Sequence, residues 1–160
     1  MLNFQKIIFS FLYVLLFSGS VLAAITSRPM AVGAIIGDPT GLTLKYLIKP
    51  DRYLDAVLAY NTGSATGIYI RGNYIVEFPK FRTLDGLPMN WYYGIGGRVY
   101  SRTNSKDENK TYLGPEILLG TGIFTGSIPV EIYLEGGLVM NLTPSTSADM
   151  DAGVGIRYWF

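Results

Sequence analysis

Ten residues at the C-terminal end of the sequence, 151–160, constrain the fold more than any other stretch. Read with the period of two of a β-strand, they separate into an apolar face and a face that mixes charge with glycine. A strand in this position leaves backbone groups along its edge unpaired unless another strand joins it. The first strand of the mature chain can supply that partner. The sequence therefore predicts a sheet that closes on itself.

The first 23 residues differ from the rest and are predicted to be a cleaved signal peptide. Lys6 precedes an apolar run over residues 7–17, interrupted by Ser10, and small residues follow it. This order of charged, apolar and small residues is typical of secretory signal peptides. The alternative is a membrane anchor helix, which needs about 20 apolar residues. We expect cleavage after Ala23 or Ala24, which leaves residues 24–160 as one β-barrel domain.

The rest of the chain is predicted to contain eight strands with short connections and no helix. These strands cover residues 31–37, 42–48, 53–60, 67–78, 90–102, 111–124, 130–142 and 151–160. Turn-forming residues separate them, as in the Asp-Pro-Thr-Gly sequence at 38–41. Short strands at this spacing are typical of an antiparallel up-and-down β-barrel. We therefore predict an all-β fold with a single barrel of about eight strands.

Alternation alone is compatible with two kinds of barrel. A soluble lipocalin-like barrel is apolar inside, whereas a membrane barrel is apolar outside. The apolar faces of strands 67–78, 130–142 and 151–160 carry no charge, and the opposite faces hold small residues and charges of both signs. Aromatic residues also gather near strand ends, as in the girdles of membrane barrels. They are Tyr46, Phe78, Trp91, Tyr93, Tyr158 and Phe160. These features favour a transmembrane barrel.

The charged faces predict a network of ion pairs in the lumen. Its candidate members are Lys45, Arg71, Glu77, Arg98, Glu116, Glu131, Glu135 and Arg157. Side chains can just fill the interior of an eight-stranded barrel, so paired charges would plug the bore. Asp149 and Asp151 could instead hold a calcium ion, although an Asp-x-Asp pair in a polar loop is more often solvated. We expect no cofactor and no metal.

The signal peptide, the eight alternating strands and the final aromatic resemble the small bacterial outer-membrane barrels of the OmpA-transmembrane and OmpX type. Segments 37–42, 92–98 and 153–160 are also similar to a group of small uncharacterised bacterial membrane barrels. In the OmpA-like class, the barrel-insertion machinery recognises the terminal strand. The matching residues here are Val154, Ile156, Tyr158 and Phe160.

This resemblance implies outer-membrane lipid and the insertion machinery as partners, and the bacterial outer membrane as the location. The long cell-surface loops of adhesin-like relatives are missing here, which argues against receptor or complement binding.

The composition limits the chemistry that the chain can perform. It contains no His and no Cys, so it has no imidazole base, no thiolate and no zinc site of the usual ligands. A Ser–His hydrolase is therefore excluded. The formal net charge of +1 gives no reason to expect nucleic acid binding.

Three functions remain open. The first is a non-enzymatic outer-membrane barrel, structural or at most weakly pore-forming, and it is the one we expect. The second is a soluble periplasmic barrel that binds a small apolar ligand. The third is a membrane enzyme that uses Glu131 and Glu135 as acid and base. A lumen of structural ion pairs explains these glutamates without any catalysis.

Overall fold

The computed structural model describes residues 28–62, 66–78, 82–84, 87–103, 109–125 and 128–160. The predicted signal peptide, residues 1–23, lies outside these ranges. Regular structure in the described residues consists of β-strands. Within this part of the chain, no helix is long and apolar enough to cross a membrane.

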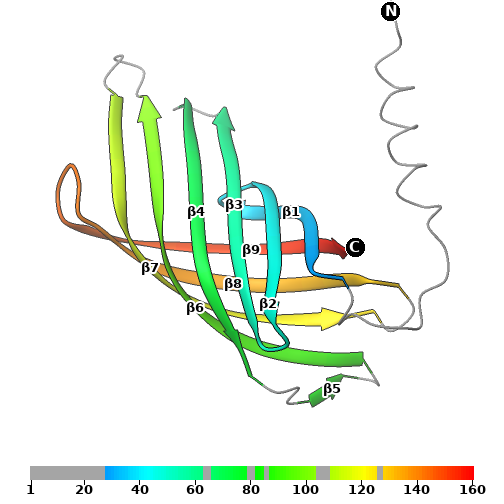
Figure 1. Cartoon of the computed structure of the whole chain (residues 1–160). Coiled ribbons are helices and arrows are strands. Elements are labelled where there is room, and N and C mark those ends of the chain that lie inside the picture. The colour runs from blue at the N-terminus through cyan, green and yellow to red at the C-terminus, as the bar shows by residue number, and fades with distance from the viewer. Residues whose placement is uncertain (1–27, 63–65, 79–81, 85–86, 104–108, 126–127) are drawn as a thin grey trace, which may run out of the picture.

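The described residues form nine strands in one antiparallel sheet (Figure 1). The strands are β1 (Met30–Asp38), β2 (Gly41–Lys49), β3 (Arg52–Thr62), β4 (Thr66–Glu77), β5 (Arg82–Leu84), β6 (Leu87–Thr103), β7 (Asn109–Phe124), β8 (Val130–Asn141) and β9 (Ser147–Trp159). Eight of them close into a ring, because β9 pairs with β1 and β4 pairs with β6. The predicted fold, a closed antiparallel barrel of eight strands, is confirmed.

The strands are strongly inclined to one another across the barrel. In the view of Figure 1, β2, β3 and β4 cross β8 and β9 at a steep angle. Such crossing is expected where the strands of a small barrel tilt by about 35–45° from its axis. Because consecutive ring strands are antiparallel, their turns alternate between two opposite ends of the barrel. We call the end where β1 begins and β9 ends the terminus end.

Most strand boundaries lie within three residues of the predicted ones, and two segments differ more. β9 begins at Ser147 rather than Asp151, because residues 147–150 pair with residues 138–141 of β8. The predicted loop at 79–88 contains β5, which pairs with the first residues of β6 outside the ring. Both segments are strands because their backbones pair with a neighbour. Each segment is too short for the alternation of its residues to predict a strand by itself.

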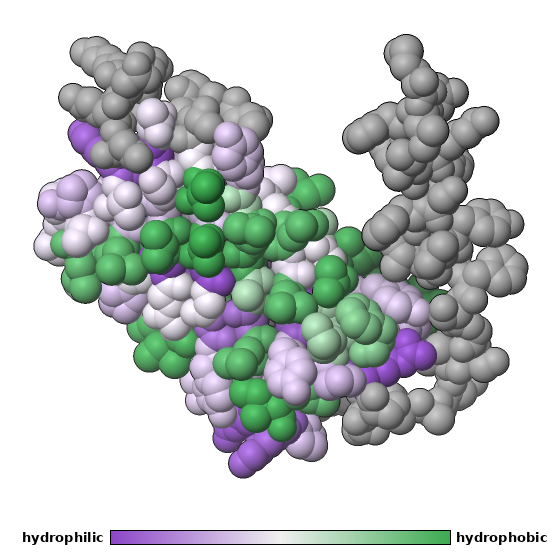
Figure 2. All heavy atoms as spheres, turned by 45° about the horizontal axis from the view of Figure 1, so that its top comes forward, coloured by the Kyte–Doolittle hydropathy of each residue, from purple (hydrophilic) through white to green (hydrophobic). Residues whose placement is uncertain are grey.

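The barrel is apolar outside and polar inside. On β8, the outward side chains Ile132 and Leu134 are 45% and 53% exposed, whereas the inward Glu131 and Glu135 are 0% and 3% exposed. Large exposed apolar side chains occur on each of the eight ring strands. Figure 2 shows such residues gathered into a band across one face of the molecule. A water-soluble fold has the opposite arrangement.

The exposed aromatic side chains predicted for a girdle gather at one end of the barrel. Phe78 lies 5.5 Å from Tyr93 between ring centroids, and its backbone N–H donates to the carbonyl of Trp91. Tyr46 pairs with Met30, and the backbone of Met30 is also bonded to that of Phe160. These contacts all lie at the terminus end, and Tyr158 lies near the end of β9, so the six aromatics belong to one end of the barrel.

Glycines inside the barrel make room for large side chains on neighbouring strands. Gly120 pairs with Tyr92 and Gly155 pairs with Tyr133, and a Cβ atom at either glycine would overlap the tyrosine ring. Gly94 is covered in the same way by Ile75. Glycine weakens a strand by itself, and covering it with an aromatic ring restores packing. These glycines therefore let a narrow interior hold bulky residues.

Candidate functional site

Among the described residues, nine Asp, Glu, Lys and Arg side chains are buried in the interior, and we call them the lumen network. They are Lys45, Asp55, Arg71, Arg98, Glu116, Glu131, Glu135, Asp151 and Arg157. Each is at most 4% exposed. They come from every strand of the ring except β1. Since isolated charges are very costly to bury, the geometry of their pairing determines whether such an interior is stable.

Arg71 and Arg157 join the carboxylates at the centre of the network. Arg71 binds Glu135, and its Nη2 lies 3.3 Å from Asp55 Oδ1. Its Nη1 lies 3.6 Å from Glu116. Arg157 Nη2 binds the other oxygen of Asp55 at 2.5 Å. The shared Asp55 therefore links the two arginines, and the ion pairs connect five strands, β3, β4, β7, β8 and β9.

Arg157 has two further contacts that fix its guanidinium. Its Nε and Nη2 donate to the hydroxyl of Thr43 at 3.0 and 2.8 Å. The guanidinium carbon lies 3.7 Å from the centroid of the Tyr133 ring, close enough for a cation–π interaction. The guanidinium thus contacts the Tyr133 ring and, through its N–H groups, the Thr43 hydroxyl at the same time.

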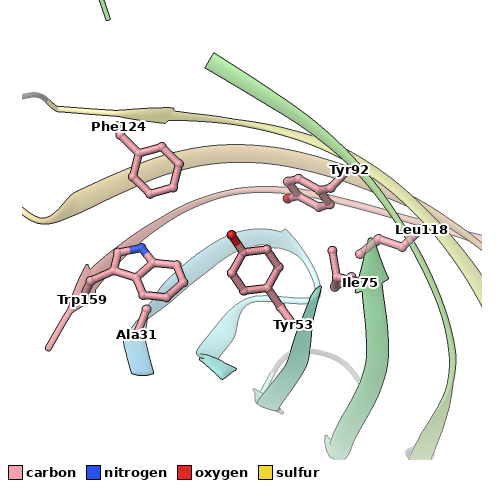
Figure 3. Packing of buried hydrophobic residues seen from close by; sticks show 7 residues of the cluster. All are labelled: Ala31, Tyr53, Ile75, Tyr92, Leu118, Phe124 and Trp159. Atoms are coloured by element: carbon pink, nitrogen blue, oxygen red, sulfur yellow. The ribbon is translucent and has the colours of Figure 1, made fainter. Parts of the chain in front are cut away.

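Lys45 is held by one carboxylate and three aromatic rings. Its Nζ lies 2.9 Å from Glu131 Oε1, and Trp159 Nε1 donates to Glu131 Oε2 at 3.2 Å. The same Nζ lies 4.3, 5.2 and 5.5 Å from the ring centroids of Tyr53, Tyr92 and Trp159. We call Tyr53, Tyr92, Trp159 and Glu131 the Lys45 cage. Figure 3 shows its three rings pointing into the interior from different strands.

Arg98 forms a separate cluster toward the opposite end of the barrel. Its Nη1 donates to Asp151 at 2.6 Å, and its Nη2 binds Asp149 and Asn141. The Tyr69 hydroxyl donates to the second oxygen of Asp151 at 2.5 Å. Asn141 Nδ2 also donates to Asp149 at 2.8 Å, so the partners of Arg98 are bonded to one another as well.

The alternatives considered for Asp149 and Asp151 need correction. Asp151 is 3% exposed, so it is not a solvated loop residue, because β9 has already begun and directs it inward. In the described residues, no group of three or more His, Cys, Asp or Glu side chains could hold a metal ion. Both aspartates instead bind Arg98.

The structure brings seven of the eight residues predicted for the lumen into the network and leaves one outside. Glu77 is half-buried at the end of β4 beside Tyr53. Glu77 is an even number of residues from Arg71, so a regular strand directs both side chains inward. Glu77 nevertheless takes part in none of the ion pairs found among the described side chains. Glu77 is the last residue of β4 and so lies near the mouth of the barrel. Alternation predicts which side of the strand a residue faces, but not how deep in the lumen it lies.

Sequence reasoning missed Asp55 and the inward role of Asp151. A signal for Asp55 does exist, since it shares a period of two with Tyr53, Val57 and Ala59, opposite the apolar Leu54 and Leu58. A signal for Asp151 exists as well, since it shares a period of two with Gly153, Gly155 and Arg157 on the face that mixes charge with glycine. The predicted network leaves it out because the sequence interpretation groups it with Asp149 in a polar loop.

The outward face of β9 carries the residues that resemble an assembly signal. Val154, Ile156 and Phe160 are 53%, 52% and 53% exposed, and Tyr158 is half-buried. They lie along the same side of the strand as the rest of the apolar exterior. Their side chains are therefore accessible on the outside of the barrel.

The geometry offers little to an acid–base mechanism. Both oxygens of Glu131 are bonded, to Lys45 and Trp159, and Glu135 is bound by Arg71 and by the Tyr92 hydroxyl. A general acid or base must come within hydrogen-bond reach of a substrate. Carboxylates that are buried and engaged in this way are structural partners of cations.

Comparisons with known proteins identify the fold and no more. No protein family matches the sequence, and no curated protein matches it. The structure is similar to the crystal structure of the N-terminal β-barrel domain of Pseudomonas aeruginosa OprF, with a TM-score of 0.67. The match covers 82% of this chain and 96% of that domain, at 14% sequence identity. The two chains share a barrel architecture.

We predict that Arg157→Met lowers the free energy of unfolding by about 3–5 kcal/mol, because it leaves Asp55 and Glu135 with fewer cations in a buried site. Arg52→Met is the matched control. Arg52 lies 3.4 Å from Asp51 in an ion pair whose side chains are 34% and 56% exposed, and losing it should cost less than about 1 kcal/mol. Urea unfolding from phospholipid vesicles measures both. Equal losses would show that the buried network adds no special stability.

Proposed function

We propose that the protein is a non-enzymatic barrel of the bacterial outer membrane, with a lumen closed by its own side chains. Its role is structural or at most weakly pore-forming. The observation that carries this proposal is the inverted distribution of polarity, in which apolar side chains surround a ring of ion pairs. The predicted signal peptide and the resemblance to OmpA-type barrels agree with export to that membrane.

The exterior supports the membrane part of the proposal. Soluble monomers rarely expose contiguous apolar patches larger than a few hundred Å². Here exposed apolar side chains occupy all eight ring strands, for example Ile36 at 74%, Leu119 at 63% and Leu58 at 54%. Lipid removes the cost of exposing them. A closed ring also satisfies the backbone without water, which any spanning structure requires.

The interior argues against the soluble lipocalin-like alternative. A barrel that binds a small apolar ligand needs an apolar lumen of suitable size. This lumen contains four buried cationic and five buried anionic side chains. An apolar ligand there would displace ion pairs and leave charges unpartnered, which is strongly unfavourable.

Two features of the interior support a closed lumen. The ionisable side chains of the lumen network are at most 4% exposed, whereas a continuous water-filled bore would wet them. Toward the terminus end, a cluster of buried apolar residues packs below the mouth (Figure 3). Its members are Ala31, Tyr53, Ile75, Tyr92, Leu118, Phe124 and Trp159.

Fractionation tests the location. We expect the mature protein in salt-washed outer membranes, with a gel mobility that changes on heating as a folded barrel denatures. The cause is the apolar exterior, which holds the protein in lipid regardless of ionic strength. Recovery in the salt-washed soluble fraction would contradict the membrane assignment and restore the periplasmic alternative.

A second prediction concerns assembly. Deleting Phe160, or replacing it by Asp, should prevent accumulation of folded barrel in the membrane, because the residue ends the apolar face of the closing strand. Phe78→Asp is the matched control, since Phe78 is also an exposed aromatic at the terminus end, 50% exposed against 53% for Phe160. Heat-modifiable protein in isolated membranes is the readout. If both variants fail alike, the girdle rather than a terminal signal is responsible.

A third prediction concerns conductance. The native protein in a planar bilayer should give no steady unitary channels, because ion pairs and rings fill its bore. Replacing Glu131 and Glu135 together by Gln removes anionic partners from Lys45 and Arg71 and should produce brief, flickering openings. Glu77→Gln, outside the lumen network, should stay silent. Large, stable channels from the native monomer would overturn the closed lumen and favour a porin.

A further inference from the structure

The surroundings of the Lys45 ammonium have the composition of a receptor for organic cations. Three aromatic rings lie within 4.3–5.5 Å of its Nζ, and Glu131 supplies a carboxylate at 2.9 Å. Aromatic faces together with a negative charge are the usual means of recognising ammonium groups. In this barrel, the cation in that place belongs to the protein.

The walls of the Lys45 cage are held by contacts that do not involve Lys45. Trp159 Nε1 donates to Glu131, and the edge of the Trp159 ring meets Tyr53 at a centroid distance of 5.9 Å. Tyr92 lies against Gly120, and its hydroxyl donates to Glu135 at 3.3 Å. The cage is therefore expected to keep its shape when the lysine side chain is removed.

The cage also lies at a position where its occupant can close the bore. Lys45 extends from β2 to Glu131 on β8, and these strands are separated in the ring by β1 and β9. Tyr53 and Phe124, the outermost members of the surrounding cluster, are 6% and 7% exposed, against 1% for Lys45. The ammonium thus lies just below the mouth at the terminus end.

We propose that the Lys45 cage is a binding site for primary alkylammonium cations, that Lys45 occupies it within the same chain, and that this occupancy closes the terminus end of the lumen. The part that concerns closure rests on the proposed function of a closed barrel. Lys45→Ala removes three methylene groups and the ammonium, so n-propylammonium is the fragment that the vacated site lacks.

Fluorescence of Trp159 measures binding directly. The chain has two tryptophans, so Trp91→Phe, at a lipid-facing position, leaves Trp159 as the reporter. In this background, Lys45→Ala barrels in phospholipid vesicles should show a saturable change in emission with millimolar n-propylammonium chloride. Sodium chloride and the neutral isostere n-propanol should cause none. Protein with Lys45 present, or with Lys45→Met filling the space, should not respond.

Adding Glu131→Gln to Lys45→Ala should weaken n-propylammonium binding by about tenfold or more, because the charged partner of the ammonium is lost. If Lys45→Ala folds poorly, its refolding yield replaces emission as the readout. The proposal expects n-propylammonium, and not n-propanol, to restore the heat-modifiable band. Absence of binding in the folded variant, or of rescue in the unfolded one, overturns the cage.

Conductance tests the closure separately. Lys45→Ala should pass more current than the native barrel, and n-propylammonium should suppress the excess while n-propanol should not. A native barrel that already conducts steadily contradicts the proposed closed function, whereas the emission titration still decides the cage. A silent native barrel whose Lys45→Ala variant binds n-propylammonium without any change in current contradicts the closing role of Lys45.

Discussion

Closure of the ring between β1 and β9 is the constraint on which the rest of the structure depends. Unpaired backbone groups along a sheet edge need a partner, and here the first and last strands supply it to each other by pairing in register. That register places small residues opposite large ones. Ala31 pairs with Trp159, and Gly33 pairs with Arg157. β1 contributes no charge to the lumen network, but its small side chains provide the space that these two residues need.

Because the bore is narrow, the charged side chains that point into it are buried and need partners of opposite charge. Seven strands direct charged residues inward, and little water can enter to solvate them, so each must find a partner across the barrel. The like charges Arg71 and Arg98 are direct cross-strand neighbours, yet they bind different carboxylates. Arg71 turns toward Glu135, whereas Arg98 turns toward Asp151. The network is therefore divided into clusters along the barrel axis, and it holds strands together that share no backbone hydrogen bonds.

Alternation of residue type was enough to predict the eight-stranded barrel, because strands have a period of two. The inverted polarity was predicted from further features, namely apolar faces without charge and aromatic residues near strand ends. Alternation was not enough to predict pairing inside. Lys45 and Glu131 lie 86 residues apart in sequence, and only the stagger of the closed ring brings them together. Parity placed Glu77 with the lumen charges, although it lies at a strand end. The predicted lumen charges leave out Asp151 because the sequence interpretation groups it with Asp149 in a polar loop, whereas β9 already begins at Ser147.

The distribution of cation types follows from their chemistry. A guanidinium offers donors along several edges, so arginine suits positions where carboxylates from different strands converge. Arg71 reaches Glu135, Asp55 and Glu116, and no single lysine ammonium could span them. Lys45 meets one carboxylate and completes its surroundings with ring faces. An ammonium is compact and strongly hydrated, so in a dry lumen it depends on those rings for what water would otherwise supply. The lysine of the network therefore lies beside three aromatic rings.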